Sequence, residues 1–108
     1  MIEFAVTTCA VAESLPRSRV ANHIAGQLIR SGTAPAPNYA ESQSAESRRD
    51  FVHKLKICLK ELRETHVWLR LIRRMGLDGS PEVKDAVRES DELISIFVAS
   101  LETARRSR

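Results

Sequence analysis

The stretch SGTAPAPNYAESQSAESRRDF, residues 31–51, decides how this chain folds, because it separates two strongly periodic segments. Its small, polar and proline-containing composition is typical of a flexible tether. Pro35 and Pro37 exclude an uninterrupted helix, since proline has no backbone N–H to donate. However, a structureless connection over residues 31–47 would exceed the ~12–15 residues beyond which such loops are uncommon in compact domains. The stretch is therefore expected to contain ordered structure.

A broken helix explains this stretch better than a tether. Proline is tolerated in the first turn of a helix, where its missing N–H has no partner in any case. Thr33 is placed to cap a new helical piece that begins at the prolines. The residues that follow, NYAESQ, contain no further helix breaker, and Tyr39 offers a large side chain to bury. We predict a helix interrupted at residues 31–37 that resumes through about Gln43, followed by a short turn at residues 44–46.

The segment 48–75 carries the strongest helical pattern. Ser47 and Asp50 form an N-cap signature, and Gly76 supplies a left-handed stop. Between them, apolar or small side chains step by four and three residues, the spacing of a heptad seam that faces a packed neighbour. The seam consists of Phe51, Leu55, Cys58, Leu62, Thr65, Leu69 and Ile72. It is widened by Val52, Leu59, Trp68, Leu71 and Met75. A stripe of this width predicts a helix with two neighbours.

A second long helix is predicted over residues 81–106. Asp78-Gly79 has turn composition, Ser80 is a cap, and Pro81 suits the first helical position. Its seam again steps by four and three residues. The members are Val83, Val87, Ser90, Ile94, Phe97, Leu101 and Ala104. Ser90 is the polar member of an otherwise apolar or small set.

The N-terminal part predicts two further helices. A break at Leu15-Pro16 precedes a helix that starts near Arg17, and a short, weakly patterned helix precedes the break. Segments 17–43, 47–75 and 81–106 match in length, as a bundle requires. Aromatic residues make up only 5% of the chain, so the core is built from aliphatic side chains. We predict an all-α fold, an up-and-down antiparallel four-helix bundle, with residues 1–108 as a single domain.

The sequence also restricts the compartment. No apolar run reaches membrane-spanning length, so no contact with a membrane is predicted. The first residues, MIEFAVTTCAVAESL, lack the basic region of a signal peptide and carry Glu3 and Glu13. Cys9 and Cys58 are far apart among apolar neighbours, which favours two reduced core thiols over a disulfide or redox role. We expect a cytoplasmic protein.

Three motifs carry a resemblance to a known family. They are RSGT at residues 30–33, NYAE at residues 38–41, and AES..DF.HKL...LKE..ET..WL at residues 45–69. Together they resemble the bacterial four-helix-bundle proteins encoded in intervening sequences of large-subunit rRNA genes. The resemblance implies an up-and-down four-helix bundle that assembles into a homopentameric ring. Related proteins accompany the reverse transcriptases of diversity-generating retroelements, where they contribute nucleic-acid and polymerase binding.

The sequence contains no recognisable catalytic, cofactor or metal motif. His23, His53 and His66 show no ligand spacing, and no nucleophile has a base and a glycine-rich elbow. Glu61 and Glu64 lack the histidine three residues on that a di-metal bundle requires. Glu64 is better interpreted as the partner of Lys60 in a surface pair four residues apart. We predict that the protein is not an enzyme and has no cofactor.

One charge pattern remains, a basic row on the helix 48–75. Its members step by four and three residues, apart from a gap that Val67 fills, and helical geometry places them opposite the seam. They are Arg49, His53, Lys56, Lys60, Arg63, Arg70 and Arg74. A solvated outer face is one interpretation. The other is a phosphate-facing stripe, which a ring would repeat around the assembly and which suits the net charge of +3.

These observations leave two main functional hypotheses, beside a third in which the protein is a structural oligomer without nucleic-acid contacts. The first is a non-enzymatic homo-oligomer that binds RNA or DNA non-specifically through the basic row. The alternative is an accessory or scaffold factor that binds a neighbouring protein such as a reverse transcriptase. Apolar residues beside the seam, Val67 and Trp68 among them, leave surface for assembly with further copies.

Overall fold

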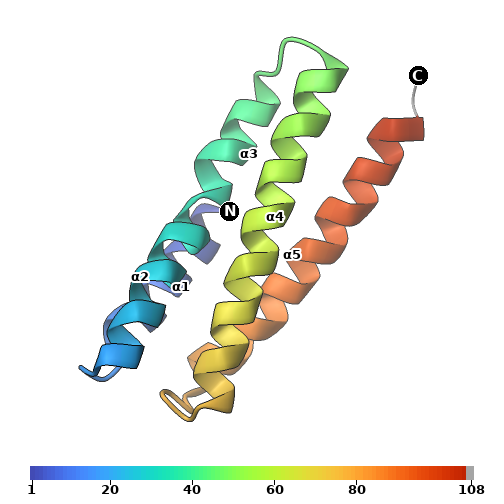
Figure 1. Ribbon diagram of the computed structural model, residues 1–108. Coiled ribbons are helices and arrows are strands. Elements are labelled where there is room, and N and C mark those ends of the chain that lie inside the picture. Colours follow the sequence, from blue (N-terminus) through green and yellow to red (C-terminus); the bar gives the residue numbers. More distant parts are fainter. Residues whose placement is uncertain (107–108) are drawn as a thin grey trace.

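The computed structural model describes residues 1–106, and every regular element in that range is a helix. The helices are α1 (Ile2–Ser14), α2 (Arg19–Thr33), α3 (Pro35–Gln43), α4 (Arg48–Arg74) and α5 (Pro81–Arg106). The bundle measures 49 × 19 × 19 Å. Successive helices run in opposite directions, except that α3 continues the course of α2 (Figure 1). Since α2 and α3 form one interrupted helix, the predicted all-α up-and-down four-helix bundle is confirmed.

The helices are arranged around a common core. α4 packs against α5 on one side and against α2 and α3 on the other, while α1 contacts both α2 and α5. Because α1 has 13 residues and α4 has 27, α1 covers only part of the bundle. The N-terminus lies near the middle of the bundle's length (Figure 1). No helix within residues 1–106 is long and apolar enough to cross a membrane.

The interruption between α2 and α3 is shorter than predicted. Only Ala34 separates the two helices, and its backbone is itself in the right-handed helical region (φ −64°, ψ −37°). The Thr33 hydroxyl donates to the Ile29 carbonyl at 2.7 Å, so Thr33 belongs to the last turn of α2 and does not cap α3. The predicted cap at Thr33 is therefore wrong. Proline φ angles are compatible with a helix, so missing N–H groups interrupt the hydrogen bonds while the chain direction is kept.

The two long helices follow the predicted pattern closely. The Ser47 hydroxyl accepts the Asp50 N–H at 3.0 Å, and Gly76 ends the helix with a φ of 70°. Seam positions that are fully or almost fully buried in α4 are Leu55, Cys58, Leu62, Thr65, Leu69 and Ile72. The buried positions of α5 are Val83, Ala86, Ser90, Phe97 and Leu101. Heptad spacing therefore located the core faces of both helices.

The polar member of the α5 seam is satisfied inside the core. The Ser90 hydroxyl donates to the Val87 carbonyl at 2.8 Å and lies 2.7 Å from Nδ1 of His66 on α4. Within residues 1–106 no buried side-chain nitrogen or oxygen lacks a hydrogen-bond partner. His66 thus has a packing role between α4 and α5.

Helices α1 and α2 approach each other closely at a glycine. A Cβ atom placed on Gly32 would lie 2.4 Å from Thr8 Oγ1 and 2.9 Å from Thr8 Cβ. Real Cβ atoms do not come so close to their neighbours, and Thr8 is fully buried. The α1–α2 contact therefore requires glycine at this position.

Asp78 fixes the connection between α4 and α5. Its carboxylate accepts the Ser80 N–H at 2.9 Å and the Ser14 hydroxyl at 2.9 Å, which ties the end of α1 to this loop. The Ser80 N–H and, to a smaller extent, the serine hydroxyls lower the pKa of Asp78. The stability that these bonds contribute is present above the ordinary carboxyl pKa and is lost as the pH falls through the lowered value.

The two cysteines are free and differ in accessibility, which predicts different reactivity. Cys58 is buried, its Sγ lies 3.7 Å from the Pro35 carbonyl, and burial raises its pKa to about 11, whereas Cys9 is partly exposed. Thiolates are the reacting species. At pH 8, Ellman's reagent should therefore label one thiol quickly in the native protein and both in guanidinium chloride. Cys9→Ser should remove the fast phase, and two equally fast native thiols would contradict the burial of Cys58.

Candidate nucleic-acid interface

The basic residues of α4 lie along a groove that this helix forms with α5. We call it the α4–α5 groove and divide it into two sections. The distal section, near the C-terminal end of α5, is lined by Arg48, Arg49, Val52, His53, Lys56, Leu59, Lys60, Arg63, Val98, Leu101, Glu102, Ala104 and Arg105. The proximal section, near the α4–α5 connection, is lined by Val67, Arg70, Leu71, Arg73, Arg74 and Val87. The two sections share no lining residue, and together they place basic residues along nearly the whole length of α4, about 40 Å.

All seven residues of the predicted row line this groove. Arg49, His53, Lys56, Lys60 and Arg63 belong to the distal section, and Arg70 and Arg74 to the proximal section. Sequence geometry placed the row opposite the seam. In the structure it forms one wall of a groove whose apolar lining includes Val52 and Leu59 of α4 and Leu101 of α5.

Three further arginines line the groove, and the row did not include them. Arg48 and Arg73 are next to members of the row in the sequence, so a prediction that allowed a wider basic face on the helix would have included them. Arg105 comes from α5, 31 residues after Arg74, and helix pairing brings it beside Lys56. Its place in the groove could not be found from the periodicity of α4 alone.

The cations of the groove have no acidic partners within residues 1–106. The nine lysines and arginines are Arg48, Arg49, Lys56, Lys60, Arg63, Arg70, Arg73, Arg74 and Arg105. The salt bridges of the described chain use other cations instead, namely Arg30, Lys54, Arg88 and Arg106. The acidic residue that lines the groove, Glu102, lies 3.9 Å from Arg106. An elongated row of unneutralised cations attracts polyanions.

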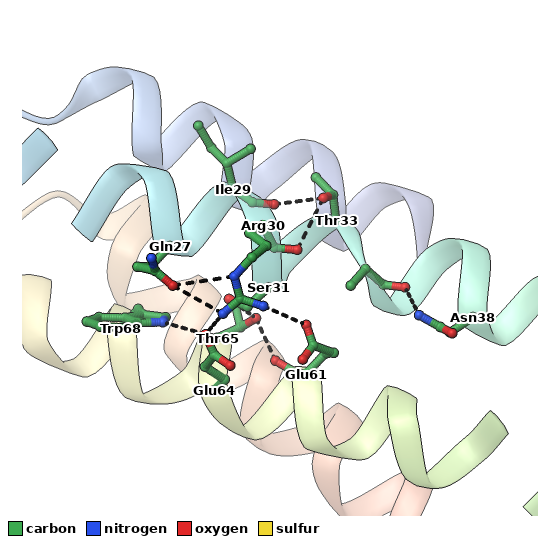
Figure 2. A network of polar contacts seen from close by, with 11 residues as sticks. Gln27, Ile29, Arg30, Ser31, Thr33, Asn38, Glu61, Glu64, Thr65 and Trp68 are labelled. Atoms are coloured by element: carbon green, nitrogen blue, oxygen red, sulfur yellow. Dashed lines mark hydrogen bonds and ion pairs between the residues drawn. The ribbon is translucent and has the colours of Figure 1, made fainter. Parts of the chain in front are cut away.

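A second polar cluster lies between α2 and α4, where Arg30 meets two carboxylates of α4 (Figure 2). The guanidinium group contacts Glu61 at 3.3 Å and also binds Glu64. The indole N–H of Trp68 donates to Glu64 at 3.1 Å. The predicted Lys60–Glu64 surface pair is therefore wrong, because Glu64 points toward α2 and is already used by Arg30 and Trp68.

The cluster continues into the core through a pair of hydroxyl groups. Thr65 lies 2.9 Å from the Ser31 hydroxyl and donates to the Glu61 carbonyl at 2.8 Å (Figure 2). Glu61 and Glu64 thus hold α2 against α4. Within residues 1–106 no group of three or more His, Cys, Asp or Glu side chains is placed to hold a metal ion. The cluster is a helix-packing network, which leaves the α4–α5 groove as the candidate functional site.

Comparisons with known proteins agree on one family. A family model described as 23S rRNA-intervening sequence protein matches residues 1–99. Among solved structures, the chain is similar to a protein of unknown function from the S23 ribosomal protein family of Bacteroides thetaiotaomicron VPI-5482. The two chains are 29% identical, the match covers 93% of each, and the TM-score is 0.82. No curated protein matches the chain.

Proposed function

The chain belongs to the 23S rRNA-intervening sequence protein family, and we propose that it is a non-enzymatic, oligomeric helical-bundle protein that binds nucleic acid through the α4–α5 groove. One observation carries this proposal. Nine lysines and arginines line the groove without an acidic partner in the described chain, whereas Arg30 and Lys54 elsewhere in the bundle are paired. Phosphates are the ligands that such a row attracts, since binding them releases condensed counterions.

The lining of the groove supports binding that is independent of sequence. Adenine edges are read by the amide side chains of Asn and Gln, and single-stranded bases stack on aromatic rings. Apart from His53, the lining contains neither amide nor aromatic side chains. Contacts from flexible Lys and Arg side chains to phosphates position a nucleic acid and carry no sequence information.

Charge reversal in the distal section tests the proposal. Lys56→Glu with Lys60→Glu should weaken binding of RNA or DNA at low salt on the order of tenfold to a hundredfold. The slope of log affinity against log salt should become shallower by about 0.7–0.9 for each phosphate that the variant no longer neutralises. The measurement is a gel-shift titration of a single strand and a duplex at several salt concentrations.

A control variant distinguishes the contribution of the groove cations to binding from that of the overall net charge. Arg17 and Arg19 are exposed at the start of α2, outside the groove, so Arg17→Glu with Arg19→Glu gives the same change in charge. This control should keep the wild-type affinity within about threefold. Equal losses of affinity in both variants would mean that net charge alone explains the effect. If wild-type protein caused no gel shift of RNA or DNA at low salt, the proposal would be wrong.

An alternative function is that of an accessory factor that binds a neighbouring protein, such as a reverse transcriptase. A hollow between α3, α4 and α5 that is lined by no charged side chain supports it, since this surface suits an apolar protein segment better than a polyanion. Its lining consists of Met1, Tyr39, Gln43, Phe51, Leu55, Leu93, Ile96, Phe97 and Ser100. Absence of nucleic-acid binding, together with co-purification of a protein encoded next to this gene, would favour the alternative.

A further inference from the structure

The proximal section of the α4–α5 groove contains two exposed apolar side chains of α4. Val67 is 50% exposed and Leu71 is 37% exposed, one helical turn apart on α4. Arg70, Arg73 and Arg74 surround them. Phosphates offer nothing to bury such side chains, whereas protein interfaces combine apolar contacts with arginine. We call this surface, defined by Val67, Arg70, Leu71, Arg73, Arg74 and Val87, the basic face.

A surface of matching character lies between α1 and α5. Its apolar part includes Val6, which is 58% exposed, together with Ala10 and Leu77. The charged residues in its lining are Asp78 and Glu82, and both are acidic. We call this surface, defined by Val6, Ala10, Leu77, Asp78 and Glu82, the acidic face. It combines apolar side chains with a charge opposite to that of the basic face.

The two faces lie at the same end of the bundle but on different flanks of α5. The end of α4, the α4–α5 connection and the start of α5 lie together at one end (Figure 1). There α5 has α4 on one flank and α1 on the other. The faces therefore point in different directions and cannot meet within one molecule. When two copies lie side by side with parallel bundle axes, the basic face of one copy and the acidic face of the other lie at the same level along the axis.

We propose that the basic face of one copy binds the acidic face of the next copy, so that the chain assembles head to tail. This inference rests on the oligomeric part of the proposed function and names the surfaces that carry it. Such a contact uses two different patches and generates a closed ring if the rotation between copies closes. Burial of Val67, Leu71 and Val6 removes apolar surface from water, and the arginines of one copy meet Asp78 and Glu82 of the next. Of the nine groove cations, the three arginines of the proximal section then serve the contact between copies, and the six cations of the distal section remain open to nucleic acid.

Complementary charge reversal tests this arrangement. The first variant carries Arg70→Glu and Arg74→Glu, which makes the basic face acidic. The second carries Val6→Lys and Glu82→Lys, which makes the acidic face basic. All four side chains are exposed, so both variants are expected to fold, and circular dichroism verifies this. Light scattering after size exclusion then measures the mass at ionic strength near 0.15 M.

Wild type should have a mass several times 12.1 kDa, and each variant alone should have the mass of one chain. An equimolar mixture of the two variants should assemble again, because each then offers the face that the other needs. Either variant keeping the wild-type mass would overturn the inference, as would a monomeric wild type or a mixture that stays monomeric.

The same preparations keep this inference separate from nucleic-acid binding. Lys56→Glu with Lys60→Glu lies in the distal section and should leave the mass unchanged while affinity for nucleic acid falls. A loss of assembly in that variant would contradict the division of the groove into two sections.

Discussion

Replacing Ile72 with alanine is expected to lower the free energy of unfolding by about 3 kcal/mol, within the ~2–5 kcal/mol typical of Ile→Ala in a core. Ile72 is 0% exposed and belongs to the single buried cluster that the helices share. Truncation removes apolar contacts and leaves a cavity that packed neighbours fill only in part. Urea or thermal unfolding at fixed protein concentration measures the loss.

The matched control is Ile96→Ala. Ile96 lies on the other long helix and is 58% exposed, so the same atoms are removed from a site that is largely in water. Ile96→Ala should lower the free energy of unfolding by less than about 1 kcal/mol. If Ile96→Ala were as destabilising as Ile72→Ala, Ile96 would have to be buried by an assembly or a partner. If Ile72→Ala were harmless, the core assigned to α4 and α5 would be wrong.

The long helices could be predicted from the sequence because their signals are local. Heptad spacing located the core faces of α4 and α5, and the caps at Ser47 and Gly76 are encoded within a few residues. The broken helix through Pro35 and Pro37 followed from loop length and proline chemistry. In each case, the deciding interaction lies within one helix or one turn.

Two of the errors concern side chains that bond to a partner other than the predicted one. Thr33 was expected to cap α3, but the helix runs on through Ala34, and the hydroxyl bonds within α2. Glu64 was predicted to pair with Lys60 on its own helix, whereas in the structure it binds Arg30 of α2 across the helix interface. Arg105 was missed for a similar reason, because its neighbour Lys56 is 49 residues away in the chain. Only the packed structure determines such choices.

The motifs that carried the family resemblance prove to be contact residues between helices. Arg30 and Ser31 of the RSGT motif bind Glu61, Glu64 and Thr65 of the LKE..ET motif (Figure 2). The motif glycine, Gly32, makes the close α1–α2 contact. These motif residues therefore build the bundle, whereas His53 and Lys60 of the third motif line the candidate groove.

Gly32→Ala is expected to destabilise the protein, although alanine normally favours a helix over glycine. The added Cβ would lie 2.4 Å from Thr8 Oγ1 and 2.9 Å from Thr8 Cβ, so α1 has to move away from α2. Overpacking of this kind costs about 1–3 kcal/mol, and the gain in helix propensity is below about 1 kcal/mol. The net loss of about 1–2 kcal/mol is measurable by urea unfolding.

Gly26→Ala is the matched control, because Gly26 lies on the same helix and a Cβ there meets nothing within 4 Å. This variant should gain about 0.5–1 kcal/mol from helix propensity, so the same substitution should change sign over six residues of α2. Thr8→Ala removes the atom nearest to the new Cβ but leaves its own Cβ in place. In a double-mutant cycle it should therefore recover part of the loss caused by Gly32→Ala. Equal stabilisation at both glycines would mean that α1 does not pack closely on α2, and the position of α1 in the bundle would have to be revised.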